Sequence, residues 1–570
     1  MKSTILSRRD LDFLLYEWLD VEKLTALDRF TEHSRETFDG VLDLCEQLAT
    51  RYFAPHNKLS DAGEPTFDGQ TVTLIPEVKE AWDAFAAADL LAMGFDDELG
   101  GAQLPVTVAQ AAFAWIAAAN VSTSGYLMLT IANANLLAHF GSPEQIETYV
   151  KPMLAGRFSG TMALSETQAG SSLADITTRA EPQSDGTYRL FGSKMWISGA
   201  EHELTENIVN LVLAKIPGGP AGTKGISLFI VPKYLADGTR NGVAISGLNH
   251  KMGQRGITNT VLNFDGAVGY LVGEPHRGIV YMFHMMNEAR LGVGMGAVAL
   301  GYTGYLKSLE YARERPQGRP LGVKDPSTAQ VPIIEHADVK RMLLAQKAYV
   351  EGGLALALYC AKLVDTGDQA VLDILTPVAK SWPSQWCLEA NNLAIQVLGG
   401  YGYTREYDVE QHYRDNRLNP IHEGTHGIQS LDLLGRKVTQ NGGASLAALG
   451  ERVAATVSAA RAGAAPEPAD QLDTAWQRLA AVTAAMFASG DVEAAMANSA
   501  VYLEAFGHIV VAWIWLEQVL AAEGRTGDFY DGKRQAARYF FHYELPKTAP
   551  QLDLLESLDR TTLEMRDNWF

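Results

Sequence analysis

The chain is poor in cysteine and short of positive charge. Only three cysteines occur among 570 residues, Cys45, Cys360 and Cys387, and their spacing matches neither a metal site nor a redox motif. Lysine and arginine number 47 against 67 aspartates and glutamates, which gives a formal net charge of -20. So few cysteines argue against a disulfide-built secreted protein and favour a reducing, intracellular compartment. The acidic balance argues against a nucleic-acid partner, because phosphate binding needs a basic face.

The sequence also lacks a long apolar run. Its most apolar stretch, Phe506 to Leu516, is shorter than the about 20 residues that a bilayer requires, so we interpret it as a buried helix. The first 22 residues mix charged with apolar side chains and predict no export signal. We therefore expect a cytoplasmic protein without a transmembrane segment, with loose membrane association left open. Apolar residues make up 47% of the chain, enough for several cores.

The spacing of apolar residues divides the chain into helical and strand-like regions. Residues 1–157 have apolar side chains three and four apart, and Ser142 with the following Pro-Glu-Gln predicts a capped helix start. Residues 158–277 contain short β-like runs between glycine, proline and asparagine. These runs are Tyr188 to Phe191, Ile208 to Ala214, Ile226 to Val231, Val243 to Leu248 and Thr260 to Phe264.

Helical patterning returns after the β region and continues to the end of the chain. Residues 278–437 predict a helical bundle, residues 438–470 a linker region, and residues 471–570 an extra helical unit. The predicted fold class is mainly α with an inserted β domain. In chain order it has a helical amino-terminal domain, a central β-barrel or sandwich, a four-helix bundle and a further helical unit.

Two short motifs suggest nucleotide or metal chemistry. Gly292, Gly294 and Gly296 resemble a dinucleotide-binding loop, but the residues on both sides predict helix, so close helix packing is favoured. His422-Glu423-Gly424-Thr425-His426 has the H-E-x-x-H letters of a zinc peptidase. That site needs an unbroken helix, which Gly424 and a nearby proline disfavour, and no third ligand has a recognisable spacing. The alternative is a turn that presents Glu423 as a base.

Two further segments have side chains suited to a flat, polar ligand. Leu164 to Ser172 combines hydroxyls with glycine at the border between the helical and β regions. Lys194 to Gly199 places Trp196 and Ser198 two residues apart, on the same side of a strand. Such a pair can stack beside a planar cofactor and donate a hydrogen bond to it, although a capped loop and a core tryptophan are the commoner explanations.

The order of these motifs along the chain resembles that of a known protein family. Leu164 to Ser172, Lys194 to Gly199, Lys251 to Arg255, Gln396 to Gly402 and Ile421 to Thr425 follow one another as do the motifs of the acyl-CoA dehydrogenase family. The chain is identified as similar to this family over about three quarters of its length. Its amino-terminal extension and extra carboxy-terminal unit resemble the larger bacterial subgroup that includes 3-methylthiopropionyl-CoA dehydrogenases.

The resemblance implies FAD as the cofactor. Leu164 and Ser165 would face the flavin pyrimidine, Trp196 would pack against the flavin, and Ser198 would bond near N5, where threonine is commoner. Ser171 would approach the pyrophosphate or the thioester. The remaining implied FAD contacts are Arg315 and Gln317 from a neighbouring subunit, Gln396, Gly399 and Gly400 at the adenosine end, and Thr425. Gly318-Arg319 departs from the family pattern beside Gln317, and Ser165 to Ser172 lacks the usual proline and aspartate.

The resemblance also implies the catalytic base. Family members carry it in the Glu-Gly-Thr turn or immediately before a helical arginine; the second position is Ala289, before Arg290, so Glu423 remains. Arg290 would neighbour the substrate or form an ion pair elsewhere, and Ser171 and Gly424 would also contact substrate. Counted back from Gly141, the acyl-pocket helix contains Ser124 and Gly125, whose small size favours a long acyl chain over a plain helix start.

The implied reaction is α,β-dehydrogenation of a fatty acyl-CoA to the trans-2-enoyl-CoA in β-oxidation. Glu423 would take the α-proton while flavin N5 accepts the β-hydride. Electrons would pass to an electron-transfer flavoprotein, and the enzyme would be a homodimer or a dimer of dimers. The alternatives are an acyl-CoA oxidase on the same scaffold, a zinc peptidase and a non-enzymatic scaffold. No metal is expected from the favoured interpretation.

Overall fold

The computed structural model describes residues 3–463 and 465–570. The chain forms two compact units, one of residues Thr25–Gly292 and one that joins Met1–Leu24 to Val293–Phe570. The amino-terminal extension therefore belongs with the carboxy-terminal half of the chain. Mainly helical structure with an inserted sheet confirms the predicted fold class.

The helices of the first unit precede its sheet along the chain. The longer ones are α2 (Arg35–Leu48), α4 (Pro76–Ala87), α5 (Val106–Ala119) and α6 (Val121–Phe140); the shorter ones are α3 (Asn57–Ala62), α7 (Pro143–Gln145) and α8 (Lys151–Leu154). The capping box predicted at Ser142 is confirmed, because its side chain accepts from the Gln145 amide while the Gln145 side chain bonds back to the Ser142 amide.

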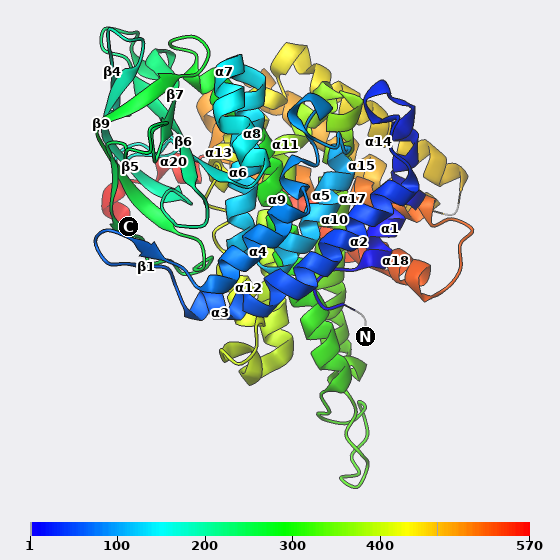
Figure 1. Cartoon of the computed structure of the whole chain (residues 1–570). Helices are drawn as coiled ribbons and strands as arrows, with labels where there is room; N and C mark the ends of the chain where they lie inside the picture. Colours follow the sequence, from blue (N-terminus) through cyan, green and yellow to red (C-terminus); the bar gives the residue numbers. More distant parts are fainter. Residues whose placement is uncertain (1–2, 464) are drawn as a thin grey trace. The chain divides into compact units, whose positions relative to one another are not determined.

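The strands of the first unit close into a barrel (Figure 1). They are β3 (Phe158–Ala163), β4 (Arg179–Pro182), β5 (Tyr188–Ser198), β6 (Asn207–Lys215), β7 (Ile226–Pro232), β8 (Val243–Leu248) and β9 (Asn259–Leu271), besides a separate hairpin of β1 (Thr66–Phe67) and β2 (Val72–Thr73). Pairing runs from β6 through β4, β5, β9 and β7 back to β6, with β3 parallel to β6 and β8 beside β9. Closure removes the open edges that invite aggregation.

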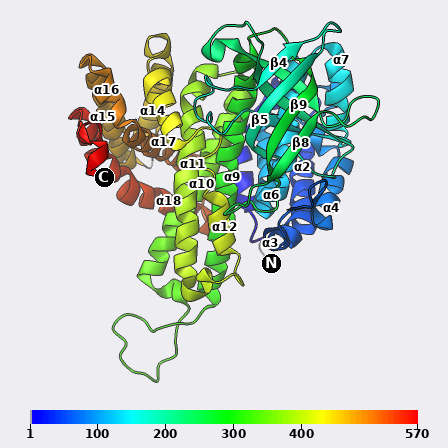
Figure 2. The ribbon, with the colours of Figure 1, turned by 90° about the vertical axis from the view of Figure 1, so that its left-hand side faces the viewer.

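Long helices dominate the second unit. They are α9 (Gly278–Glu314), in which the boundary between the units falls, α10 (Ala337–Thr366), α11 (Gln369–Leu398) and the shorter α12 (Val409–Asn416). Figure 2 shows α10 and α11 running side by side. A Cβ built on Gly294 would lie 2.0 Å from the carbonyl oxygen of Ala379 in α11. The helical interpretation of the glycine-rich segment is thus confirmed, and this glycine permits close packing.

Further helices follow the bundle to the end of the chain. They are α13 (His426–Asp432), α14 (Ala444–Ala462), α15 (Pro466–Ala488), α16 (Val492–Ala497), α17 (Ser499–Ala521), α18 (Asp528–Tyr539), α19 (Thr548–Glu556) and α20 (Thr561–Glu564). The range predicted as a linker thus contains α14, whose buried Leu449, Val453 and Val457 hold helical spacing within an alanine-rich segment.

The apolar stretch after residue 505 belongs to a longer helix than its composition indicated. Among the described residues, α17 alone is long and apolar enough to cross a membrane by length and composition, with 23 residues. Most of its apolar window, 83%, is nevertheless buried inside the protein. The predicted burial is confirmed, whereas the length argument was wrong.

A buried ionic cluster ties the first residues of the chain to its last helices. The Lys533 ammonium on α18 ion-pairs with Asp10 on α1 (Arg8–Asp12), and with Glu351 on α10 at 2.9 Å. Lys347 ion-pairs with Glu351, and the Tyr302 hydroxyl donates to Asp10 over 2.9 Å. Asp10 and Glu351 are 1% and 3% exposed. Two cations balance two carboxylates, which is what makes their burial tolerable.

Candidate active site

The residues of the H-E-x-x-H motif, His422 to His426, form a turn followed by the start of a helix. Glu423 has a φ of 53° and Gly424 a φ of 88°, both in the left-handed region, and α13 begins only at His426. Glutamate in this region costs about 1–3 kcal/mol and persists only where its surroundings hold it. The two histidines therefore do not share a helix face, as the zinc peptidase requires. Thr425 is the N-cap of α13, accepting from the Ile428 amide over 3.3 Å.

Two buried side chains hold the carbonyl groups of this turn. The ammonium of Lys380, on α11, donates to the carbonyl of Asn419 over 2.8 Å and to that of Gly424 over 2.7 Å. The Gln429 side-chain amide, on α13, donates to the carbonyl of Glu423 over 3.1 Å. Both side chains are fully buried. The backbone on the carboxyl side of Glu423 is therefore fixed from within the protein.

A chain of buried amides ties His422 to the bundle. The His422 Nε2 lies 3.0 Å from Asn419 Oδ1, Asn419 donates to Asn416 over 2.8 Å, and Asn416 donates to Asn391 over 2.7 Å. Asn391 in turn donates to the carbonyl of Leu300 in α9 over 2.9 Å. Burial, together with the Lys380 cation, lowers the pKa of His422 to about 3. His422 is hence neutral at physiological pH, with Nε2–H as the donor.

The barrel presents a large aromatic ring to solvent. Between the pairs Lys194–Leu262 and Ile197–Thr260, β5 carries one residue more than β9, and Trp196 sits in this bulge with a φ of 66°. Its side chain is 61% exposed. Ser198 ends the strand, its hydroxyl accepting from Asn259 over 3.0 Å. The indole of Trp196 points outward, whereas the side chain of Ile197, between Trp196 and Ser198, is buried.

An exposed tryptophan held at positive φ fits a planar ligand. Such strain costs about 1–3 kcal/mol and is found at binding sites. A flavin ring could cover the exposed indole of Trp196 on the rim of the barrel. The hydroxyl of Ser198, two residues along the chain, offers a polar contact. The residues of this rim therefore fit the cofactor that the resemblance implies.

The loop that contains Leu164 and Ser165 is organised by a buried ion pair. The Lys194 ammonium donates to the carbonyl of Leu164 over 2.9 Å and to the Glu166 carboxylate over 3.0 Å. Thr177 and Thr178 each donate a backbone amide and a hydroxyl to Glu166. Burial opposes ionisation of Glu166, but Lys194 and these donors lower its pKa to about 2. Burial lowers the pKa of Lys194 to about 8.

Lys194→Met is expected to weaken FAD binding by about tenfold or more. Removing one partner of a buried ion pair costs about 3–5 kcal/mol and would loosen the loop that the pair holds. Fluorescence titration of the stripped protein with FAD measures the effect. The control is Lys224→Met, which removes an exposed lysine of the same unit. An unchanged FAD affinity in Lys194→Met would contradict the positioning role of the pair.

The residues predicted for the adenosine end and for the contact from a neighbouring subunit all belong to the second unit. The Arg315 guanidinium lies 5.5 Å from the ring centroid of Tyr401, within the turn that follows α11. Gly399, with a φ of 61°, and Gly400 begin that turn, and Gln396 is exposed in the last turn of α11. Arg315 also lines a cavity of about 540 Å³ beside Leu398 and Tyr407. Gln317 lies in the loop beyond α9, its amide donating to Val331 over 3.0 Å.

The remaining predicted residues are placed as follows. Ser171 is exposed in the loop after β3, and Arg290 is 4% exposed, which argues against a surface ion pair. Gly125 packs tightly, because a Cβ there would lie 2.8 Å from Ile257. The preference for a long acyl chain stays a prediction. Glu288, not singled out from the sequence, accepts from Asn135 over 2.7 Å, and burial raises its pKa.

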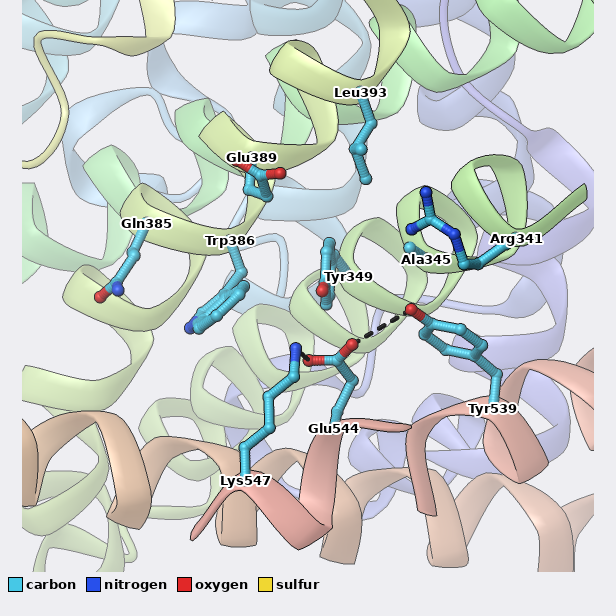
Figure 3. A pocket seen from close by; sticks show the side chains of 10 residues that line it. All are labelled: Arg341, Ala345, Tyr349, Gln385, Trp386, Glu389, Leu393, Tyr539, Glu544 and Lys547. Carbon is cyan, nitrogen blue, oxygen red and sulfur yellow. Dashed lines mark hydrogen bonds and ion pairs between the residues drawn. The ribbon is translucent and has the colours of Figure 1, made fainter. Parts of the chain in front are cut away.

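A second cavity of about 340 Å³ lies between α10, α11 and residues 539–547 (Figure 3). Its polar groups are largely satisfied within the protein: Glu544 ion-pairs with Lys547 at 2.7 Å and accepts from Tyr539 over 3.2 Å. None of the predicted site residues lines it. Within the described residues no group of three or more potential metal ligands occurs.

Four consecutive segments match protein-family models. Residues 42–157 match the acyl-CoA dehydrogenase N-terminal domain, 161–267 the middle domain, 276–438 the C-terminal domain, and 449–566 the acetyl-CoA dehydrogenase C-terminal-like domain. The chain belongs to the acyl-CoA dehydrogenase family. It is an oxidoreductase of that class, and the family's cofactor is FAD, so the predictions of family, enzyme class and cofactor are confirmed.

Individual relatives extend over almost the whole chain. A 3-methylmercaptopropionyl-CoA dehydrogenase from Ruegeria pomeroyi is 36% identical, over 93% of this chain and 94% of the relative. A broad-specificity linear acyl-CoA dehydrogenase from Mycobacterium tuberculosis is 33% identical, over 99% of both. An acyl-CoA dehydrogenase from Bacillus anthracis, solved in complex with FAD, shares the fold with a TM-score of 0.74, 18% identity and coverage of 94% of this chain and 90% of that one.

Proposed function

We propose that this enzyme removes two hydrogens from a fatty acyl-CoA thioester and releases the trans-2-enoyl-CoA, with Glu423 as the base. The observation that carries the proposal is the strained turn at Glu423 and Gly424, whose carbonyl groups accept hydrogen bonds from the fully buried Gln429 and Lys380. Strained backbone conformations of this kind cluster at active sites. The relatives named for linear acyl-CoA and 3-methylmercaptopropionyl-CoA substrates support a thioester of this kind.

The carboxylate of Glu423 takes the proton from Cα of the thioester. The α-proton is a weak acid, so the negative charge that develops on the thioester oxygen must be stabilised, and we assign part of this to the Glu423 backbone N–H. Bound FAD supplies the two-electron acceptor for the hydrogen at Cβ. Leu164, Ser165, Ser171, Trp196, Ser198 and Thr425 would hold it, together with Arg315, Gln317, Gln396, Gly399 and Gly400. Gly424, Arg290 and Ser171 are the proposed substrate contacts.

Anaerobic mixing with a panel of saturated acyl-CoA thioesters tests the proposal. The protein as purified is expected to be yellow, and its absorbance near 450 nm should bleach as one thioester is converted to its enoyl product. The panel should run from short to long chains and include 3-methylthiopropionyl-CoA, because no described residue fixes the chain length. A flavin that no acyl-CoA bleaches would contradict the proposed reaction.

The electron acceptor and the assembly are further parts of the proposal. We infer an electron-transfer flavoprotein as acceptor, so dye-linked turnover should exceed hydrogen peroxide formation in air; the reverse would make the enzyme an oxidase. We also propose a homodimer or dimer of dimers in the cytoplasm. The half-exposed Tyr401 and the exposed Tyr403 beside the predicted adenosine end support an intersubunit surface. Light scattering and cell fractionation test these points.

A further inference from the structure

The turn at Glu423 is held by side chains that lie outside the motif in which it occurs. Lys380 is 43 residues upstream, in the interior of α11, and Gln429 is on the buried face of α13. Both are fully buried. We propose that Lys380 and Gln429 are positioning residues that set the direction in which the Glu423 carboxylate points. The inference rests on the proposed function of Glu423 as the base.

The hydrogen bonds show how these side chains act. A carbonyl shares its peptide plane with the following N–H group, so the bond from Gln429 to the Glu423 carbonyl fixes the plane between Glu423 and Gly424. The bond from Lys380 to the Gly424 carbonyl fixes the next plane. Together they oppose the peptide flip that would change ψ of Glu423 and φ of Gly424, and so they hold the backbone from which the Glu423 side chain projects.

The remaining contacts of the turn act in the same direction. Lys380 also donates to the carbonyl of Asn419, whose side chain accepts from His422 on the amino side of Glu423. A Cβ on Gly424 would lie 2.5 Å from the Gln429 amide nitrogen, so glycine is required for the close approach of Gln429 as well as for the backbone conformation. The turn that carries Glu423 is thus supported on both sides by buried groups.

The test measures proton abstraction alone. An acyl-CoA analogue with sulfur in place of Cβ can lose its α-proton to a base and regain a deuteron from D2O, but it has no Cβ–H to transfer as hydride. Incorporation of deuterium at Cα, followed by mass spectrometry, then reports the α-C–H cleavage step. The analogue should have the chain length of the thioester that bleaches the flavin fastest.

Lys380→Met is expected to slow this exchange by about a hundredfold, the loss that a misplacement of about 1 Å brings. FAD content and the affinity for the analogue should stay within about twofold of wild type, since the change acts on the base and not on binding. Lys437→Met is the matched control. Lys437 is 6% exposed and pairs with Asp373 at 3.2 Å in the same unit, so its loss removes a buried lysine without touching the turn.

Gln429→Met keeps the test decisive if Lys380→Met fails to fold. The Oε1 atom of Gln429 is buried without a hydrogen-bond partner, so an apolar side chain of similar length should be tolerated there. Exchange is expected to fall by about tenfold in this variant. A folded Lys380→Met or Gln429→Met protein that exchanges at the wild-type rate would overturn the proposal. If Glu423→Gln itself exchanged normally, the assignment of the base would fail instead.

Discussion

Glu423→Gln should bind FAD as the wild type does and lose dehydrogenation by at least about a hundredfold, the lower end of general-base effects. The amide has the shape of the carboxylate but cannot accept the α-proton. Because Gln429 and Lys380 bind the backbone carbonyls of Glu423 and Gly424, the substitution leaves the turn intact. Stopped-flow bleaching of the flavin, with the ratio of FAD to protein determined beforehand, measures the effect.

The control for this variant is Glu467→Gln, a change of the same kind at an exposed position in the first turn of α15. It should bleach at the wild-type rate. Near-normal bleaching by Glu423→Gln would remove Glu423 from the mechanism. A colourless Glu423→Gln protein would show instead that the turn itself contributes to holding the cofactor.

Lys533→Met is expected to lower the free energy of unfolding by about 3–5 kcal/mol, the cost of breaking a buried ion pair. Lys533 is fully buried and balances Asp10 and Glu351, so its removal leaves two buried carboxylates with Lys347 as the remaining cation. Burial already raises the pKa of Asp10 in the wild type. Urea denaturation followed by circular dichroism gives the change in midpoint at constant slope.

Two further variants separate charge imbalance from lost packing. Combining Lys533→Met with Asp10→Asn restores neutrality and should recover part of the stability, because the two changes act on one network and are not additive. Arg560→Ala breaks a half-exposed pair with Asp491 and should cost less than about 1 kcal/mol. A Lys533→Met protein within about 1 kcal/mol of wild type would contradict a stabilising role for the cluster.

Local patterns in the sequence predicted the order of helices and strands well. The short β-like runs located β6, β7 and β8 to within one residue at each end, whereas β9 extends seven residues beyond the predicted run at its carboxyl end. The runs did not reveal β3 and β4, which are short and diluted by small or charged residues. Nor did they reveal the bulge at Trp196, because an extra residue in one strand is defined only by its pairing with β9.

Residues of the candidate site that are adjacent in the chain could be predicted from the sequence, whereas residues that only the fold brings together could not. A five-residue motif was enough to predict a turn at Glu423, because Gly424 and a nearby proline disfavour a helix there. Nothing in the sequence around Lys380 indicates a role in the site. A lysine within an apolar helix can be assigned to a site only once the fold shows that it contacts the turn. The same holds for the pair of Glu166 and Lys194, which lie in separate motifs and meet across the barrel.

The pairing of Asp10 with Lys533 has a consequence for how the polypeptide is made. More than five hundred residues separate the two, and at about 5–20 residues per second the ribosome needs roughly half a minute to nearly two minutes to span them. Throughout that interval the leading aspartate has no partner from α18. Until α18 is made, the Asp10 carboxylate must therefore do without the cation that balances it in the folded protein.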